Sequence, residues 1–107
     1  MQRMTLVRYT AKPDRADENE ALSRKVFAEL KSARPNGASY ALFRDGNDFV
    51  HLFVNFEADD SSPITDLSSF QTFLKSIDER CEVPPQTTRL ALNLVESYGF
   101  SAAMAPA

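Results

Sequence analysis

Residues 49–56, with the sequence FVHLFVNF, constrain the fold more than any other stretch of this chain. Side chains of a β-strand alternate between its two faces. One face would carry Val50, Leu52, Val54 and Phe56, and the other Phe49, His51, Phe53 and Asn55. A strand that is largely apolar on both faces is normally covered on both faces. We therefore expect helices of the same chain on one side and a second covering partner on the other.

Length and composition predict one domain over residues 1–100, with residues 101–107 as a frayed tail of small residues. The net charge of -3 gives no basic footprint, so a nucleic acid partner is not expected. No apolar run is long enough for a membrane span, and no signal peptide pattern is present. The single cysteine, Cys81, cannot form an internal disulfide, so we expect a reducing, cytoplasmic setting and a buried, inert thiol.

The first half of the chain predicts a strand over residues 4–11 and a helix from Asp14 or Asp17 to Arg34. Asp17 and Glu20 have the spacing of a capping box at the start of that helix. The apolar stripe of the helix comprises Leu22, Val26, Phe27, Leu30 and Ala33. A second strand follows over residues 39–44, and the polar turn at residues 45–48 joins it to residues 49–56 as a hairpin.

The second half predicts one helix within residues 66–81, capped by Asp66 or Ser68, and a last strand over residues 88–98. The apolar positions of that helix are Leu67, Phe70, Phe73, Leu74, Ile77 and Cys81. Residues 82–85, which include two prolines, are expected to end the helix, and the acidic loop at residues 57–63 is expected to be solvated.

This order of elements favours an α+β, ferredoxin-like βαββαβ fold, in which both helices cover one face of a four-stranded antiparallel sheet. Residues 49–56 then form a central strand. We expect its aliphatic face to meet the helices and the face with His51 to meet a second copy of the chain, or a cavity beside it. The residues expected on that open face are Ala41, Phe43, Phe49, Phe53, Ala91 and Val95. Such a face would be too apolar for water, so we expect a homodimer through it.

Two segments of the sequence resemble segments of known protein groups. Residues 7–13, with the sequence VRYTAKP before an acidic helix start, resemble the first strand and turn of the dimeric α/β barrel superfamily. Residues 67–74, with the sequence LSSFQTFL, resemble the second helix of its antibiotic-biosynthesis-monooxygenase group. The resemblance spans residues 4–99 and implies a dimeric barrel. Some members of this group are cofactor-independent oxygenases of phenolic or quinol-like substrates, while others degrade haem, isomerise or only bind.

His51 is the only histidine and the leading candidate for acid–base catalysis in an apolar cavity. Its alternative is a histidine that is satisfied at a dimer interface. Arg8, Asn55, Asn93 and Phe53 are the candidate ligand-binding residues around it. Arg8 is equally well explained as part of a surface or interface ion pair. Asn93 is more often an amide that is hydrogen-bonded at an interface. The tyrosines Tyr9, Tyr40 and Tyr98 could donate to a ligand oxygen, but such residues more often pack by their rings.

Other chemistry is disfavoured by the residue inventory. One histidine and one cysteine cannot form a usual zinc site, and the three glycines form no phosphate-binding loop, so no metal and no cofactor are expected. Three hypotheses remain open. The first is a cofactor-independent monooxygenase or related proton-transfer enzyme on a small aromatic or quinol-like substrate. The second is a non-catalytic dimer that binds a small apolar or aromatic ligand or has a stress-related role. The third is a structural dimer in which Phe43, Phe49 and Phe53 fill the space.

Overall fold

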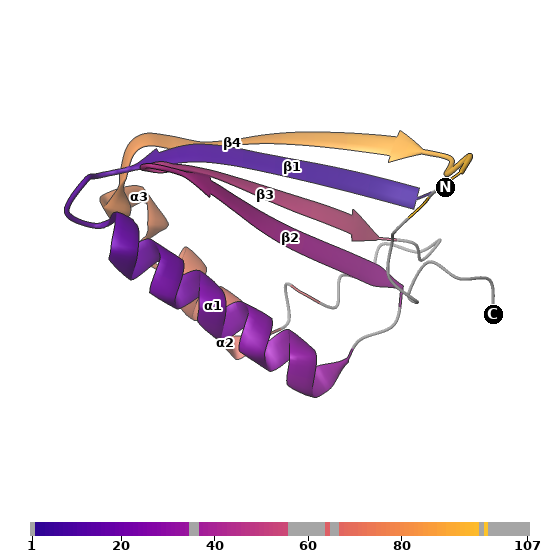
Figure 1. Ribbon diagram of the computed structural model, residues 1–107, viewed down its shortest axis with the longest axis horizontal. Coiled ribbons are helices and arrows are strands. Elements are labelled where there is room, and N and C mark those ends of the chain that lie inside the picture. Colours follow the sequence, from indigo (N-terminus) through magenta and orange to yellow (C-terminus); the bar gives the residue numbers. More distant parts are fainter. Residues whose placement is uncertain (1, 35–36, 56–63, 65–66, 97, 99–107) are drawn as a thin grey trace.

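The protein is an α+β structure in which one layer of helices packs on a four-stranded sheet (Figure 1). The computed structural model describes residues 2–34, 37–55, 64, 67–96 and 98. The elements follow the order β1 (Gln2–Ala11), α1 (Ala16–Ala33), β2 (Ala38–Asp45), β3 (Asp48–Asn55), α2 (Ser68–Leu74), α3 (Ile77–Arg80) and β4 (Cys81–Leu92). Predictions for Phe56, Asp66, the acidic loop and the tail at 101–107 lie outside the described residues.

The sheet has the order β2-β3-β1-β4, and every neighbouring pair is antiparallel. The predicted ferredoxin-like topology, with the first and third strands in the centre, is therefore confirmed. The hairpin between β2 and β3 pairs Asp45 with Asp48 across the turn. Gly46 in this turn has a φ of 61°, a conformation that glycine adopts without the strain of a side chain.

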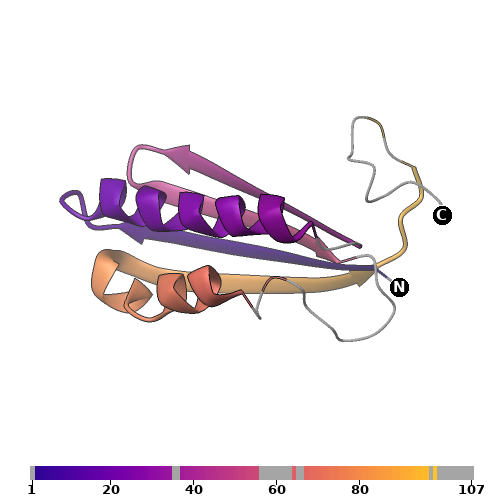
Figure 2. The same ribbon diagram turned by 90° about the horizontal axis from the view of Figure 1, so that it is seen from below.

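The helix α1 covers the sheet through its apolar stripe, and Figure 2 shows all three helices on the same side. Val26 is fully buried, while Leu22 and Leu30 pack against the core. The predicted capping box is wrong, because Arg15 is the N-cap residue and makes no side-chain capping bond. The carboxylates of Asp17 and Glu20 instead each lie 3.1 Å from the guanidinium of Arg44 on β2.

The second half of the chain departs from its predicted boundaries. The expected single helix is interrupted at Lys75–Ser76, and α3 turns Ile77 and Arg80 into the interior. The last strand begins at Cys81 and includes both prolines. They are tolerated because β4 is an edge strand and its register with β1 shifts at this point, so the ladder is already interrupted where the two N–H groups are missing. It ends at Leu92, so the predicted continuation to residue 98 is wrong.

The two faces of β3 are reversed relative to the prediction. Phe49 and His51 are buried beneath the helices, and Phe53 packs against that core. The helices therefore meet the aromatic face of β3, not its aliphatic face. The aromatic rings stack on neighbouring strands, as Phe49 does on Tyr9 at a centroid distance of 5.4 Å. Rings of α2 pack on the same face, because Phe73 lies 5.5 Å from His51 and Phe70 lies 6.1 Å from Phe53 between ring centroids, so aromatic contacts join this face to the helices.

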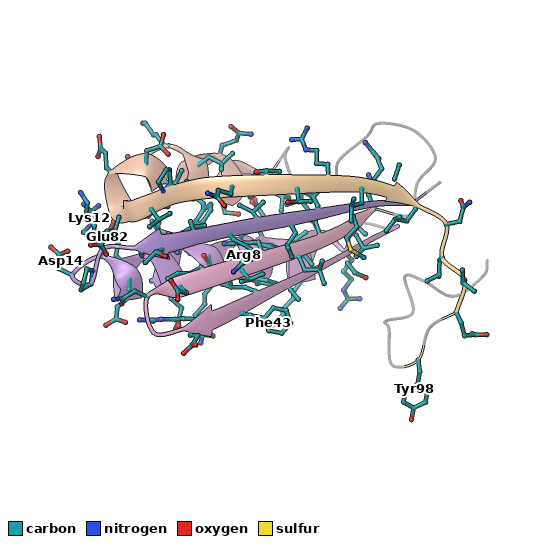
Figure 3. The ribbon with its side chains drawn as sticks, turned by 90° about the horizontal axis from the view of Figure 1, so that it is seen from above. Arg8, Lys12, Asp14, Phe43, Glu82 and Tyr98 are labelled. Atoms are coloured by element: carbon teal, nitrogen blue, oxygen red, sulfur yellow. The ribbon has the colours of Figure 1, made fainter. Side chains whose placement is uncertain are left out.

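The opposite face of the sheet carries aliphatic side chains and no covering element among the described residues. Ala41, Leu52, Leu6 and Thr88 form one row across the four strands. Figure 3 views this face with the helices behind it, and Arg8 and Phe43 both lie on it. Phe43 has 59% of its surface exposed. Of the residues predicted here, Ala41 and Phe43 are placed as expected, whereas Ala91 lies on the helix side and Val95 lies beyond β4.

None of the helices in the described part of the chain is long and apolar enough to cross a membrane.

Replacement of Phe49 by alanine is expected to lower the free energy of unfolding by about 3–5 kcal/mol, because a fully buried ring is exchanged for a cavity. Urea unfolding followed by circular dichroism measures this loss. The control is Tyr98→Ala, which removes an aromatic ring that is fully exposed and should change stability by less than about 0.5 kcal/mol. Equal effects of the two substitutions would contradict the assignment of Phe49 to the helix-covered face.

Candidate functional site

His51 lies in the centre of β3 with 2% of its surface exposed, and both of its ring nitrogens have a tyrosine partner. The hydroxyl of Tyr9 on β1 lies 2.8 Å from Nε2. The hydroxyl of Tyr40 on β2 lies 2.5 Å from Nδ1. His51 is thus held between its two neighbouring strands, and a ligand can exchange protons with it only through a tyrosine or by displacing one.

The hydrogen bonds continue from Tyr9 into the helices. Asn19 on α1 donates from Nδ2 to the Tyr9 hydroxyl at 2.7 Å. Arg80 at the end of α3 donates from Nε to Asn19 Oδ1 at 3.1 Å and from Nη2 to the carbonyl oxygen of Phe73 at 2.7 Å. We call this set of Tyr40, His51, Tyr9, Asn19 and Arg80 the buried polar chain. It connects three strands and two helices.

Burial determines the protonation of the titratable groups in the buried polar chain. Desolvation lowers the pKa of His51 from 6.5 to about 4, so the imidazole is neutral at neutral pH. Desolvation also raises the pKa of Tyr9 and of Tyr40, so both hydroxyls keep their protons. The Asn19 amide and the charge of Arg80 partly oppose this shift at Tyr9. His51 and its two tyrosine partners therefore form a row of neutral groups that share exchangeable protons.

A cavity of about 740 Å³ lies beside the buried polar chain, between the sheet and the helices α2 and α3. Its size falls in the range of small-molecule sites. Aromatic and aliphatic residues form one part of its wall: Tyr9, Phe53, Phe70, Phe73 and Ile77, together with His51. Polar residues from three strands form another part: Arg3, Thr5, Asn55, Thr87 and Arg89. An aromatic molecule that carries oxygen substituents matches this combination.

Several solved structures share this architecture. The chain matches the Rv0793 protein of Mycobacterium tuberculosis with a TM-score of 0.71 and 19% identity, over 91% of this chain and 100% of that one. The chain has the fold of the dimeric α/β barrel proteins. A proposed antibiotic biosynthesis monooxygenase of Caulobacter crescentus matches with a TM-score of 0.70 and 18% identity, over 86% of this chain and 91% of that one. A proposed antibiotic biosynthesis monooxygenase of Nitrosomonas europaea matches with a TM-score of 0.69 and 15% identity, over 83% of this chain and 88% of that one.

Sequence comparison gives no closer relationship. No protein-family model matches the chain, and no curated protein sequence matches it significantly. At the identities of the structural matches, the similarity shows the fold alone. The predicted resemblance to the dimeric α/β barrel superfamily is confirmed at that level, and the chemistry has to be inferred from the residues of this chain.

Within this ferredoxin-like fold, the predicted site residues separate into two groups. His51, Phe53 and Asn55 lie together on the wall of the cavity. Arg8 lies on the opposite face of the sheet, because it pairs with Val50 and so has the other parity. Asn93 is exposed just beyond the end of β4. The expected convergence of Arg8 with His51 is therefore wrong, and the roles of the other residues in ligand binding stay predictions.

Sequence reasoning did not select Asn19 or Arg80, and it gave Tyr9 and Tyr40 a packing role. The buried positions of α1 are Ala16, Asn19, Ser23 and Val26. Asn19 and Ser23 thus continue the helical stripe toward the N-terminus at the same spacing of three and four residues. Two polar residues on the inner stripe of a helix are the signal that could have revealed the buried polar chain. Arg80 gives no comparable signal, because its inward direction depends on the break between α2 and α3.

His51 is expected to titrate with a pKa of about 4, because its imidazolium form would be buried. The measurement is the pH dependence of the ring proton resonances, which are unambiguous because the chain has one histidine. The pKa is lower in the folded than in the unfolded chain, so the folded state loses stability as the pH falls from about 6.5 toward about 4. That loss amounts to about 3 kcal/mol.

The control for this stability change is His51→Phe, which lacks the titrating group while the carboxylates remain. The difference between the two proteins in the free energy of unfolding, measured at pH 7.5 and at pH 4, isolates the histidine. A titration midpoint near 6.5 in the folded protein would contradict the buried, neutral state of His51.

Proposed function

We propose that this protein is a cofactor-independent monooxygenase, or a related proton-transfer enzyme, that acts on a small aromatic or quinol-like molecule. One observation carries this proposal. A neutral histidine, hydrogen-bonded to a tyrosine at 2.8 Å, lies on the wall of a cavity that also carries several aromatic rings. The fold shared with proposed antibiotic biosynthesis monooxygenases is consistent with this activity.

The chemistry begins with removal of a proton from a substrate hydroxyl. The substrate oxygen gives its proton to the Tyr9 oxygen, and Tyr9 gives its own proton to Nε2 of His51. Nδ1 then passes its proton to the Tyr40 oxygen while the Tyr40 hydroxyl, which is only partly buried, releases its own proton to water, so His51 returns to the neutral state. The resulting phenolate or enolate is electron-rich and reacts with dioxygen. When a ring CH₂ group is oxidised to a carbonyl, one oxygen atom enters the product and the other leaves as water.

Oxygen uptake with a panel of quinols and anthrone-like phenols is expected for the wild-type protein, measured with an oxygen electrode. His51→Phe and Tyr9→Phe should each lower kcat/KM by roughly 100-fold or more, because each interrupts proton transfer. Tyr98→Phe removes an exposed hydroxyl and is the matched control. Unchanged uptake in His51→Phe would remove this residue from the mechanism.

A non-catalytic ligand-binding protein is the second candidate. It is favoured by the completeness of the hydrogen bonds, since every buried side-chain nitrogen and oxygen among the described residues has a partner. A site that is already satisfied can act as a rigid wall for an apolar ligand. Binding of the same phenols without oxygen uptake would favour this candidate. The filled-barrel hypothesis loses its basis, because Phe43 lies on the opposite face from Phe49 and Phe53.

We also propose that the open sheet face joins two copies of this chain. Phe43, Leu90 and Leu92 are 59%, 47% and 46% exposed, and the central row of this face includes Leu6 and Leu52. A monomer rarely leaves so extended an apolar surface in water. Because the helices occupy the other face, a symmetric pairing of sheets covers it without disturbing the cavity.

The expected mass in solution is that of two chains at micromolar concentration, measured by light scattering after gel filtration. Leu52→Glu should shift the mass toward one chain, because it places a charge in the centre of the proposed interface. Lys25→Glu, on the exposed side of α1, is the control and should leave the mass unchanged. A wild-type protein with the mass of one chain would refute the dimer.

A further inference from the structure

Arg80 is a buried arginine on which Glu18 acts electrostatically without forming an ion pair. Arg80 is 1% exposed, and no carboxylate among the described residues forms an ion pair with it. Its guanidinium lies over the ring of Phe73 at 5.1 Å from the centroid and donates to that residue's carbonyl oxygen. Burial of a charge is unfavourable unless the charge is well hydrogen-bonded, so the second bond, to Asn19 Oδ1, is an important one.

Arg80 determines the orientation of the Asn19 amide. A guanidinium can only donate hydrogen bonds, so the side-chain oxygen of Asn19 must face Arg80. The amide nitrogen then faces Tyr9, and its N–H donates to the phenol oxygen at 2.7 Å. Reversing the amide would place an N–H against the guanidinium and leave both groups without an acceptor. Arg80 therefore determines that Asn19 accepts from the arginine and donates to Tyr9.

Asn19 in turn determines the direction of the Tyr9 hydroxyl. The Tyr9 oxygen already accepts a hydrogen bond from Asn19, so its own proton points to a neighbour that can accept, and Nε2 of His51 lies 2.8 Å away. Nε2 is then an acceptor, and in a neutral imidazole the other nitrogen carries the proton. Nδ1–H donates to the hydroxyl of Tyr40. The opposite tautomer would direct two N–H groups at the Tyr9 oxygen and turn the phenolic proton toward Ser23.

We propose that Asn19 and Arg80 are positioning residues that hold His51 in the tautomer protonated at Nδ1, with Nε2 accepting from Tyr9. Its catalytic meaning rests on the proposed function, because this tautomer prepares Nε2 to take the proton that Tyr9 receives from a substrate. The tautomer itself is a property of the protein without any substrate. Arg80 cannot act as a proton acceptor, so protons do not pass through that end of the buried polar chain and can be exchanged only through the hydroxyls of Tyr9 and Tyr40.

The decisive variant is Asn19→Asp. The new carboxylate would pair with Arg80 and could only accept hydrogen bonds, so the Tyr9 proton would turn toward residue 19. The Tyr9 oxygen would then be free to accept from His51, and the tautomer should invert to the form protonated at Nε2. This substitution also supplies the ion-pair partner that Arg80 lacks, so the variant is expected to fold.

The measurement is the ¹⁵N spectrum of the imidazole in protein labelled at histidine, recorded at pH 7.5, where the single histidine gives two ring signals. The wild type should show a protonated Nδ1, and Asn19→Asp a protonated Nε2. Asn47→Asp, the same change in the β2–β3 turn, should resemble the wild type. Arg80→Met releases the amide and should give a mixture of tautomers, with the exposed Arg24→Met as its control.

Two results would overturn the proposal: a wild-type protein protonated at Nε2, or an Asn19→Asp variant that keeps the wild-type tautomer. A misfolded Arg80→Met variant changes neither test, because Asn19→Asp decides the question alone. Oxygen uptake separates this proposal from the proposed function. An inverted tautomer in a protein without uptake supports the positioning role and not the enzyme. Uptake with no inversion supports the enzyme and refutes the positioning role.

Discussion

The hydrogen bonds from Tyr40 to Arg80 are the interaction on which the rest of the structure depends. They run through β2, β3, β1, α1 and α3, which are all of the major elements except α2 and β4. A polar group buried without a partner costs roughly 1–3 kcal/mol, so each element has to be placed correctly for the others to be satisfied. The buried polar chain therefore restricts the position of α1 and α3 on the sheet more than apolar contacts do, because apolar contacts tolerate small displacements and hydrogen bonds do not.

The same bonds give the site its chemical properties. Burial keeps His51 neutral, and its two tyrosine partners keep it hydrogen-bonded at both nitrogens. A buried imidazole without such partners would be costly, and a solvated one would titrate near neutral pH. Stability and the proposed proton transfer thus depend on the same few contacts. A substitution in this region will affect both, and only measurements of protonation can separate the two effects.

The order and type of the elements could be predicted from local signals, such as the polar turn at residues 45–48 and the apolar stripe of α1. Which face of β3 meets the helices could not be predicted, because both faces are largely apolar. The two polar residues, His51 and Asn55, suggested that their face met a second copy of the chain or a cavity beside it. The partner of His51, Tyr9, is 42 residues distant, and Arg80 is 61 residues from Asn19. Satisfaction of a buried polar group by such distant residues leaves no periodic pattern in the sequence.

Because the two faces of β3 are reversed, the proposed dimer interface and the proposed catalytic site lie on opposite sides of the sheet. If His51 faced the partner subunit, any change at the interface would also alter the site. In the observed arrangement the aliphatic face of β3, with Val50 and Leu52, points away from the helices, and the aromatic face contains the cavity. The open face of the sheet also carries Arg8 and Thr88, so a surface that covers it has to be largely apolar and to leave the guanidinium of Arg8 hydrated or paired. The cavity face is specific in its hydrogen bonds, and it can keep its chemistry whether or not the other face is paired.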